Sequence, residues 1–293
     1  MKYRLILVAA VFSFLLISCQ KETPADGGNT TVTAKTILNA GYGGIAAQVM
    51  DIYLPANRST LTTKVIILIH GGGWTEGDKN DPLFAPFVDS LKKRLPDYAV
   101  FNINYRLSAT PLNLFPTQEQ DVKAATEFIY AKRNEYGISD KFVMAGASAG
   151  AHLAMLQAYK NNSPVKAKAV ISFFGPSDLL DMYNNPVNNN PFIPLGLAQA
   201  VGKTPAQDAL IYTNSSPVNF ISSSTAMPTI LLHGGLDPLV KPQQSLAVAT
   251  KLTAAGIASE NILYATAGHG DWNAATYTDA FNKIQAFLAL HVL

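Results

Sequence analysis

The chain of 293 residues is 48% hydrophobic and 14% charged, so it can bury a large core within one α/β domain of ordinary size. Its formal net charge is +2, and 20 basic residues balance 20 acidic ones if Lys2 and Arg4 are removed with an N-terminal targeting segment. This balance excludes the basic surface of a nucleic-acid-binding protein and gives no electrostatic preference for anionic substrates.

The N-terminus has the pattern of a bacterial export signal. Two basic residues precede the apolar run 5–17, which is short for a transmembrane helix. We therefore expect residues 1–18 to be cleaved as a signal peptide. With the next residue, Cys19, the chain reads Leu-Ile-Ser-Cys, which resembles the lipobox of bacterial lipoproteins. An ordinary secretory signal with an incidental cysteine is the alternative.

This resemblance implies that Cys19 is lipidated and becomes the first residue of the mature chain. Cys19 is the only cysteine, so no disulfide can form within one chain. Two or more acyl chains anchor a protein stably to a membrane, which predicts a location in the bacterial cell envelope, periplasmic or surface-exposed. The polar residues 19–33 are expected to form a flexible tether, and residues 34–293 the folded domain.

Strand-like and helical segments alternate along the domain. Near-continuous apolar strands separated by helices predict a mostly parallel, eight-stranded sheet with helices on both faces. Ligand sites in such sheets lie at the carboxyl ends of the strands. The predicted strands are 35–39, 48–54, 65–69, 99–104, 141–145, 167–174, 229–232 and 261–265, and the predicted helices are 83–94, 117–136, 151–160, 242–255 and 276–291.

A first glycine-rich segment, Gly41-Tyr42-Gly43-Gly44, lies between the first two predicted strands. A phosphate-binding loop would continue with Gly-Lys-Ser or Gly-Lys-Thr, and this segment does not. The sequence therefore favours a hairpin turn.

A second glycine-rich segment surrounds Ser148, where the chain reads Gly-Ala-Ser-Ala-Gly between a predicted strand and a predicted helix. A serine on such a tight turn is exposed above the sheet, which makes Ser148 a candidate nucleophile. The same pattern also arises where a strand merely packs tightly against the following helix. The nucleophile interpretation is favoured by the segment His-Gly-Gly-Gly-Trp at 70–74, which follows another predicted strand.

The two segments complement each other in acyl transfer. The carbonyl oxygen gains charge as it becomes tetrahedral, and free backbone N–H groups stabilise that charge. We expect Gly72, Gly73 and Ala149 to supply these N–H groups as an oxyanion hole. Trp74, at the end of the glycine-rich loop, either lines the acyl pocket or wedges the loop.

From about residue 48 to the C-terminus, the chain resembles the α/β-hydrolase family, and specifically its small bacterial carboxylesterases related to carbohydrate-ester and feruloyl esterases. This resemblance is carried by the glycine-rich segment at 70–74 with its continuation Trp-Thr-Glu-Gly-Asp-Lys at 74–79, by the separate segment Asn-Tyr-Arg-Leu-Ser at 104–108, and by the glycine-rich turn around Ser148. It implies that Tyr105 and Arg106 support the loop structurally.

The family's chain order is serine, then acid, then histidine, and this implies the other two catalytic residues. Asp237 follows the predicted strand 229–232 and is assigned as the acid, and His269 follows the last strand as the general base. Asp178 is an alternative acid that we interpret as a loop or capping carboxylate. Asp271, two residues after His269, is interpreted as a solvent-facing or structural group.

The other histidines have structural interpretations. His70 and His233 end strands and are expected to hydrogen-bond the loops that shape the site, His152 to pack in the core, and His291 to lie near the C-terminus. None has the spacing of metal ligands, so we predict no metal and no cofactor.

The segment 179–227 is rich in Asn and Pro and is expected to form a small cap-like insertion between strands six and seven that shapes the pocket. The sequence thus predicts a serine carboxylic-ester hydrolase acting through an acyl-enzyme on acetyl or feruloyl esters of carbohydrates or on other small esters. The alternatives are a serine peptidase of the prolyl-oligopeptidase type, for whose usual propeller the chain has no room, and a catalytically silent binding module.

Overall fold

The computed structural model describes residues 32–82 and 84–293. The predicted signal peptide, Cys19 and most of the predicted tether lie outside these residues. Within the described part of the chain, no helix is both long enough and apolar enough to cross a membrane.

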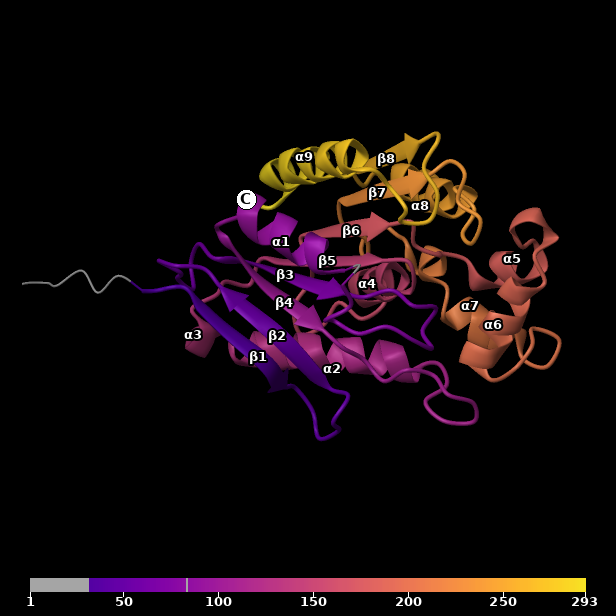
Figure 1. Ribbon diagram of the computed structural model, residues 1–293, viewed down its shortest axis with the longest axis horizontal. Coiled ribbons are helices and arrows are strands. Elements are labelled where there is room, and N and C mark those ends of the chain that lie inside the picture. Colours follow the sequence, from indigo (N-terminus) through magenta and orange to yellow (C-terminus); the bar gives the residue numbers. More distant parts are fainter. Residues whose placement is uncertain (1–31, 83) are drawn as a thin grey trace, which may run out of the picture. The chain divides into compact units, whose positions relative to one another are not determined.

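The predicted sheet is confirmed. Eight strands pair in the order β1-β2-β4-β3-β5-β6-β7-β8 (Figure 1). The strands are β1 (Lys35–Gly41), β2 (Val49–Leu54), β3 (Lys64–Ile69), β4 (Tyr98–Ile103), β5 (Phe142–Ala147), β6 (Ala169–Phe173), β7 (Thr229–Gly234) and β8 (Ser259–Tyr264).

Strand direction changes only at the β1 edge of this sheet. β1 pairs antiparallel with β2, with Gly41 opposite Val49, so the glycine-rich segment after β1 lies in a hairpin connection. β2 is also antiparallel to β4, whereas all the remaining pairs are parallel. The carboxyl ends of six neighbouring strands therefore meet at one edge of the sheet.

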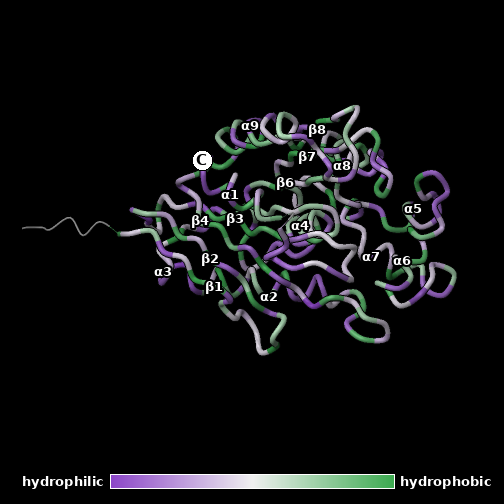
Figure 2. The backbone as a smooth tube through the Cα atoms, viewed as in Figure 1, coloured by the Kyte–Doolittle hydropathy of each residue, from purple (hydrophilic) through white to green (hydrophobic). Residues whose placement is uncertain are grey.

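Helices cover both faces of the sheet, because alternate side chains of a strand point to opposite faces. Ile67 and Ile69 of β3 belong to a core cluster with residues of α2, α4 and α8, whereas Ile66 and Leu68 belong to a second cluster with residues of α1 and α9. Figure 2 shows the hydrophobic residues along these central strands. The helices are α1 (Ala85–Arg94), α2 (Thr117–Ala131), α4 (Ala149–Tyr159), α8 (Gln243–Ala254) and α9 (Ala274–His291).

One predicted helix is divided. The segment 117–136 forms α2 and a short helix α3 (Arg133–Tyr136), and Lys132 between them has φ −89° and ψ 4°, away from helical values. Gly137 then ends α3 in the left-handed conformation that glycine adopts without steric cost.

The segment between β6 and β7 contains three short α-helices and two 3₁₀ turns. Figure 1 shows α5, α6 and α7 gathered near the carboxyl ends of the parallel strands. These elements are α5 (Leu179–Asn184), η1 (Val187–Asn189), α6 (Phe192–Val201), α7 (Ala209–Asn214) and η2 (Pro217–Phe220).

Candidate active site

Ser148 stands on a sharp turn between β5 and α4, with φ 53° and ψ −122°. A residue with a Cβ rarely adopts positive φ, so the surrounding structure must stabilise this conformation. Gly146 and Gly150 allow the close approach that it needs. A Cβ on Gly146 would lie 2.4 Å from the backbone of Gly150, and one on Gly150 would lie 2.1 Å from the carbonyl oxygen of Ile69.

The structure brings Ser148, His269 and Asp237 together from the ends of three parallel strands. Ser148 Oγ lies 2.9 Å from Nε2 of His269, and Nδ1 of His269 lies 2.7 Å from Oδ2 of Asp237. A carboxylate only accepts hydrogen bonds, so Nδ1 of His269 donates and Nε2 is left to accept the serine proton.

The two alternative acids, Asp178 and Asp271, have other structural positions. Asp178 is the N-cap of α5 and accepts a hydrogen bond from the Asp181 N–H at 3.0 Å. Asp271 is exposed on the loop after His269. Among the described residues, the carboxylate that hydrogen-bonds His269 is that of Asp237.

The carboxylate of Asp237 is buried, and both of its oxygens accept hydrogen bonds. Its Oδ1 accepts hydrogen bonds from the N–H groups of Leu239 and Val240, each at 2.8 Å, and His233 Nε2 lies 3.3 Å from Oδ2. Burial alone would raise the pKa of Asp237, but hydrogen bonds from His233, His269 and the Val240 N–H, with the charge of His269, lower it. Asp237 is therefore ionised at neutral pH.

The glycine-rich loop after β3 presents backbone donors beside Ser148. Gly72 and Gly73 have φ 104° and 56°, and within the described residues no group accepts from their N–H groups. The carbonyl of Gly72 instead accepts from the N–H groups of Thr75 and Glu76. Ala149 is the first residue of α4, where a helix leaves its N–H groups unpaired and favours negative charge.

His70 and Tyr105 support the start of this loop. Tyr105 stacks on the His70 ring at 4.4 Å, and its hydroxyl lies 3.3 Å from the carbonyl oxygens of His70 and Gly71. Burial lowers the pKa of His70, although its hydrogen bond to the Gly71 carbonyl raises the pKa in part. The ring is therefore neutral at neutral pH.

The end of the loop is supported by His152. Trp74 is buried and lines the cavity, and its Nε1 donates to Nδ1 of His152 at 3.3 Å. Burial lowers the pKa of His152 to about 4, although a hydrogen bond to the Ser215 carbonyl opposes the shift. The predicted core position of His152 is correct, but its polar partners could not be predicted from the sequence, since Trp74 and Ser215 are 78 and 63 residues away.

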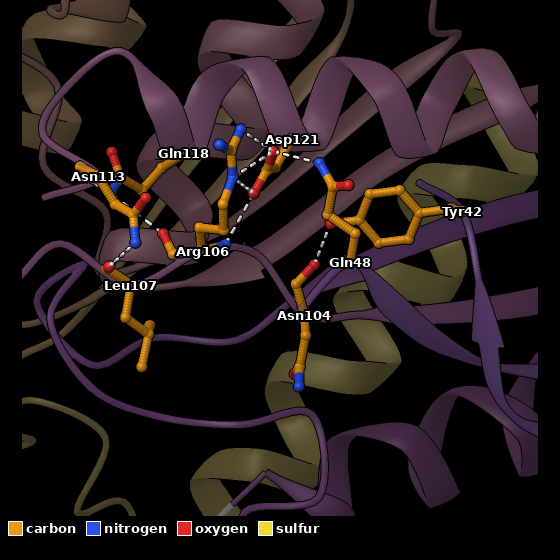
Figure 3. Close-up of polar contacts among 8 residues, drawn as sticks. All are labelled: Tyr42, Gln48, Asn104, Arg106, Leu107, Asn113, Gln118 and Asp121. Carbon is orange, nitrogen blue, oxygen red and sulfur yellow. Dashed lines mark hydrogen bonds and ion pairs between the residues drawn. The ribbon is translucent and has the colours of Figure 1, made fainter. Parts of the chain in front are cut away.

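A polar network fixes the segment after β4, as Figure 3 shows. Asp121 of α2 accepts two side-chain hydrogen bonds from Arg106 Nε at 2.9 and 3.1 Å, a third from Nη2 at 2.6 Å, and one from Gln48 Nε2 at 2.8 Å. The hydroxyl of Tyr42 donates to the carbonyl of Asn104 at 2.6 Å. This network attaches the chain around Tyr105 to α2 and to the β1–β2 hairpin.

A buried ion pair involves Lys79, which follows the glycine-rich loop 70–74 in the chain. Nζ of Lys79 is 3.0 Å from Oδ1 of Asp51, and their side chains are only 1% and 2% exposed. The backbone of Lys79 is bound on both sides, because its N–H donates to Asn104 Oδ1 and its carbonyl accepts from Asn102 Nδ2. The sequence offered no signal for this pair of residues.

Lys79→Met should destabilise the protein by about 3–5 kcal/mol, because it leaves the Asp51 carboxylate buried without its counter-charge. Urea unfolding followed by circular dichroism measures this change. The matched control is Lys123→Met, which breaks a half-exposed pair with Glu127 and should leave the free energy of unfolding unchanged within error. Equal midpoints for the two variants would contradict the prediction.

Ser148 and His269 line a cavity of about 1340 Å³. Its lining is largely aromatic and aliphatic, and α5 and α6 of the insertion contribute part of it. Residues 32–82 and 84–293 contain no cluster of three or more His, Cys, Asp or Glu side chains able to hold a metal ion. The apolar lining residues include Phe84, Phe87, Phe174, Phe192, Ile193, Leu197 and Trp272.

The sequence is similar to a known protein family and to proteins named as ester hydrolases. The model of the BD-FAE family matches residues 50–252. The chain is 30% identical to the probable carboxylic ester hydrolase LipM of Mycobacterium tuberculosis over 217 residues, which cover 70% of this chain and 48% of LipM. The chain spans about half the length of the curated relatives LipM and LipQ.

Solved structures show the same fold. A carbohydrate esterase from gut microbiota superposes with a TM-score of 0.77 at 24% identity, covering 89% of this chain and 97% of that one. A bifunctional GH43-CE protein of Bacteroides eggerthii superposes with a TM-score of 0.75 at 27% identity, covering 88% of this chain and 38% of that one. The predicted α/β-hydrolase fold is thereby confirmed.

Proposed function

Since the chain belongs to the BD-FAE family, we propose that it is a serine carboxylic-ester hydrolase that acts through an acyl-enzyme on Ser148. The observation that carries this proposal is the continuous hydrogen-bonded line from Ser148 Oγ through His269 to Asp237, at 2.9 and 2.7 Å. The family match includes Ser148 and Asp237, and its esterase-named relatives support the same chemistry.

In the acylation step, Ser148 Oγ attacks the ester carbonyl carbon while Nε2 of His269 takes the hydroxyl proton. The charge that develops on the carbonyl oxygen is stabilised by the N–H groups of Gly72, Gly73 and Ala149. Collapse of the tetrahedral intermediate breaks the bond to the alcohol oxygen, and His269 gives its proton to the leaving alcohol. Asp237 stabilises the imidazolium that exists between the two transfers.

Deacylation repeats these steps with water as the nucleophile. His269 takes a proton from water, the hydroxide adds to the acyl carbon, and the proton returns to Ser148 Oγ as the carboxylic acid leaves. The products are one alcohol and one carboxylic acid, and no cofactor takes part.

The substrates that we propose are acetyl or feruloyl esters of carbohydrates, or other small esters. Support comes from the carbohydrate esterase of gut microbiota among the similar structures and from the size and aromatic lining of the cavity. The insertion contributes Phe192, Ile193 and Leu197 to that lining, so we propose that it selects the acyl or alcohol group.

Hydrolysis by the full chain in detergent tests the function. The panel is a p-nitrophenyl ester series of increasing chain length, acetylated xylan and methyl ferulate. Turnover of acetyl or feruloyl esters of carbohydrates supports the proposed substrate class, whereas a preference for long acyl chains indicates a lipid esterase. An inactive wild type that also fails to react with a fluorophosphonate would contradict the enzyme assignment and favour a silent binding module.

Gly72→Ala keeps the backbone N–H but should displace it from the oxyanion. We therefore expect kcat to fall by about 10²- to 10³-fold, the usual effect of losing one oxyanion donor. A Cβ there would lie 2.1 Å from the carbonyl oxygen of Glu76, and φ is 104°, so the loop must shift. Steady-state kinetics on p-nitrophenyl acetate measure the loss. Gly44→Ala is the control, because its Cβ meets nothing within 4 Å, and it should keep full activity. A normal kcat in Gly72→Ala would contradict the proposed oxyanion hole.

We also propose that the protein is anchored to a membrane of the cell envelope through lipid on Cys19. The support is the sequence alone, namely the apolar run and the lipobox-like residues before Cys19. Metabolic labelling with a radioactive fatty acid should mark the wild type, and Cys19→Ala should lose the label and leave the membrane fraction. A labelled or still membrane-bound variant would contradict lipidation at this position.

A further inference from the structure

His152 lies where α4, the insertion 179–227 and the glycine-rich loop 70–74, here called the oxyanion loop, meet. It is one turn beyond Ser148 on a helix whose residues are all buried, and its own side chain is 0% exposed. Its Nε2 lies 2.6 Å from the carbonyl oxygen of Ser215, and its Nδ1 lies 3.3 Å from Nε1 of Trp74. A carbonyl can only accept and an indole N–H can only donate, so the tautomer protonated at Nε2 satisfies both partners.

Trp74 is the end of the oxyanion loop. It follows Gly73 directly and has φ 63°, a strained value for a side chain of this size. Such a conformation persists only where neighbouring groups fix it. The ring of Trp74 packs edge-on against His152 at 5.2 Å and Phe115 at 5.6 Å, and its carbonyl accepts from the Ser108 N–H at 2.8 Å.

The insertion holds both sides of this arrangement. On one side, Ser215, the residue after α7, accepts from His152. On the other side, the carbonyl of Ala200 in α6 accepts from Ser108 Oγ at 3.1 Å and from the Phe115 N–H at 3.2 Å. Each residue that touches the Trp74 ring or its carbonyl in these contacts is thus bonded to the segment 179–227.

We propose that His152 is a positioning residue that transmits the placement of the insertion to the oxyanion loop. It lies behind Trp74 and is not part of the cavity lining, so it acts through Trp74 on the N–H groups of Gly72 and Gly73. The insertion then contributes to the rate as well as to the shape of the pocket. This proposal rests on the ester hydrolase function proposed above.

The test uses the full chain and compares His152→Phe, Trp74→Phe and the double variant on p-nitrophenyl acetate. His152→Phe keeps a ring but removes both hydrogen bonds, and Trp74→Phe removes the indole N–H without touching α4. Each single variant should lose about 10- to 100-fold in kcat, the scale of a small displacement of catalytic groups. KM should be little changed in His152→Phe, because His152 is not part of the cavity lining. The kcat of the double variant should be no lower than the kcat of the slower single variant, because both substitutions break the same connection.

Tyr159→Phe is the matched control. It lies on the same buried helix and loses a hydrogen bond of 2.6 Å with Thr229 Oγ1, so it should lower the melting temperature and leave kcat unchanged. Normal kcat in both His152→Phe and Trp74→Phe, or losses that multiply in the double variant, would overturn the positioning role while leaving the proposed function intact. A wild type without esterase activity would overturn both.

Discussion

Ser148→Ala is expected to lose about 10⁶-fold in kcat, the effect seen when the nucleophile of a serine hydrolase triad is removed. Alanine retains a Cβ, so the strain at φ 53° is the same and the fold should be preserved. Esterase assays on wild type and variant measure the loss, and thermal unfolding with unchanged circular dichroism shows that the variant is folded.

The control for this variant is Ser172→Ala in the neighbouring strand β6. Within the described residues, the buried Oγ of Ser172 has no hydrogen-bond partner, so its removal should leave activity and stability unchanged. Substantial turnover by a clean preparation of Ser148→Ala would contradict the assignment of the nucleophile.

Asp237→Asn should lower kcat by about 10⁴-fold with little change in structure. In the wild type, the carboxylate accepts hydrogen bonds from ring nitrogens of His269 and His233. The amide of asparagine would instead turn N–H donors toward these rings, and His269 would be held in the wrong tautomer. Steady-state kinetics at neutral pH measure this loss.

The two alternative acids supply matched controls for that substitution. Asp178→Asn keeps an N-cap of equal quality, and Asp271→Asn changes an exposed side chain, so both should keep activity close to wild type. A loss of 10⁴-fold in either control, with an active Asp237→Asn, would identify a different acid.

The fold could be predicted from the sequence because its signals are local. β3 and β5 are continuous apolar runs that needed no knowledge of their partners, and the glycines around Ser148 indicated a strand-to-helix turn directly. The break at Lys132 was missed, since the helical pattern of 117–136 continues across it and only backbone angles reveal the change.

The candidate site was predictable to the extent that its residues follow strands. Asp237 and His269 could be assigned from the chain order that the family resemblance implied, and the structure places His269 between Ser148 and Asp237, in hydrogen-bond contact with both. The supporting contacts could not be predicted, because each joins residues far apart in the chain. Gln48 and Asp121 are 73 residues apart, and His152 and Ser215 are 63 apart.

The measurement that tests the central claim most directly is the reaction of the full chain with a fluorophosphonate, followed by intact mass and peptide mapping. Ser148 should carry one stoichiometric phosphonyl group, and the extent of modification should match the loss of esterase activity. An adduct on a different residue, or full esterase activity in protein that carries no adduct after prolonged exposure, would contradict an acyl-enzyme mechanism through Ser148.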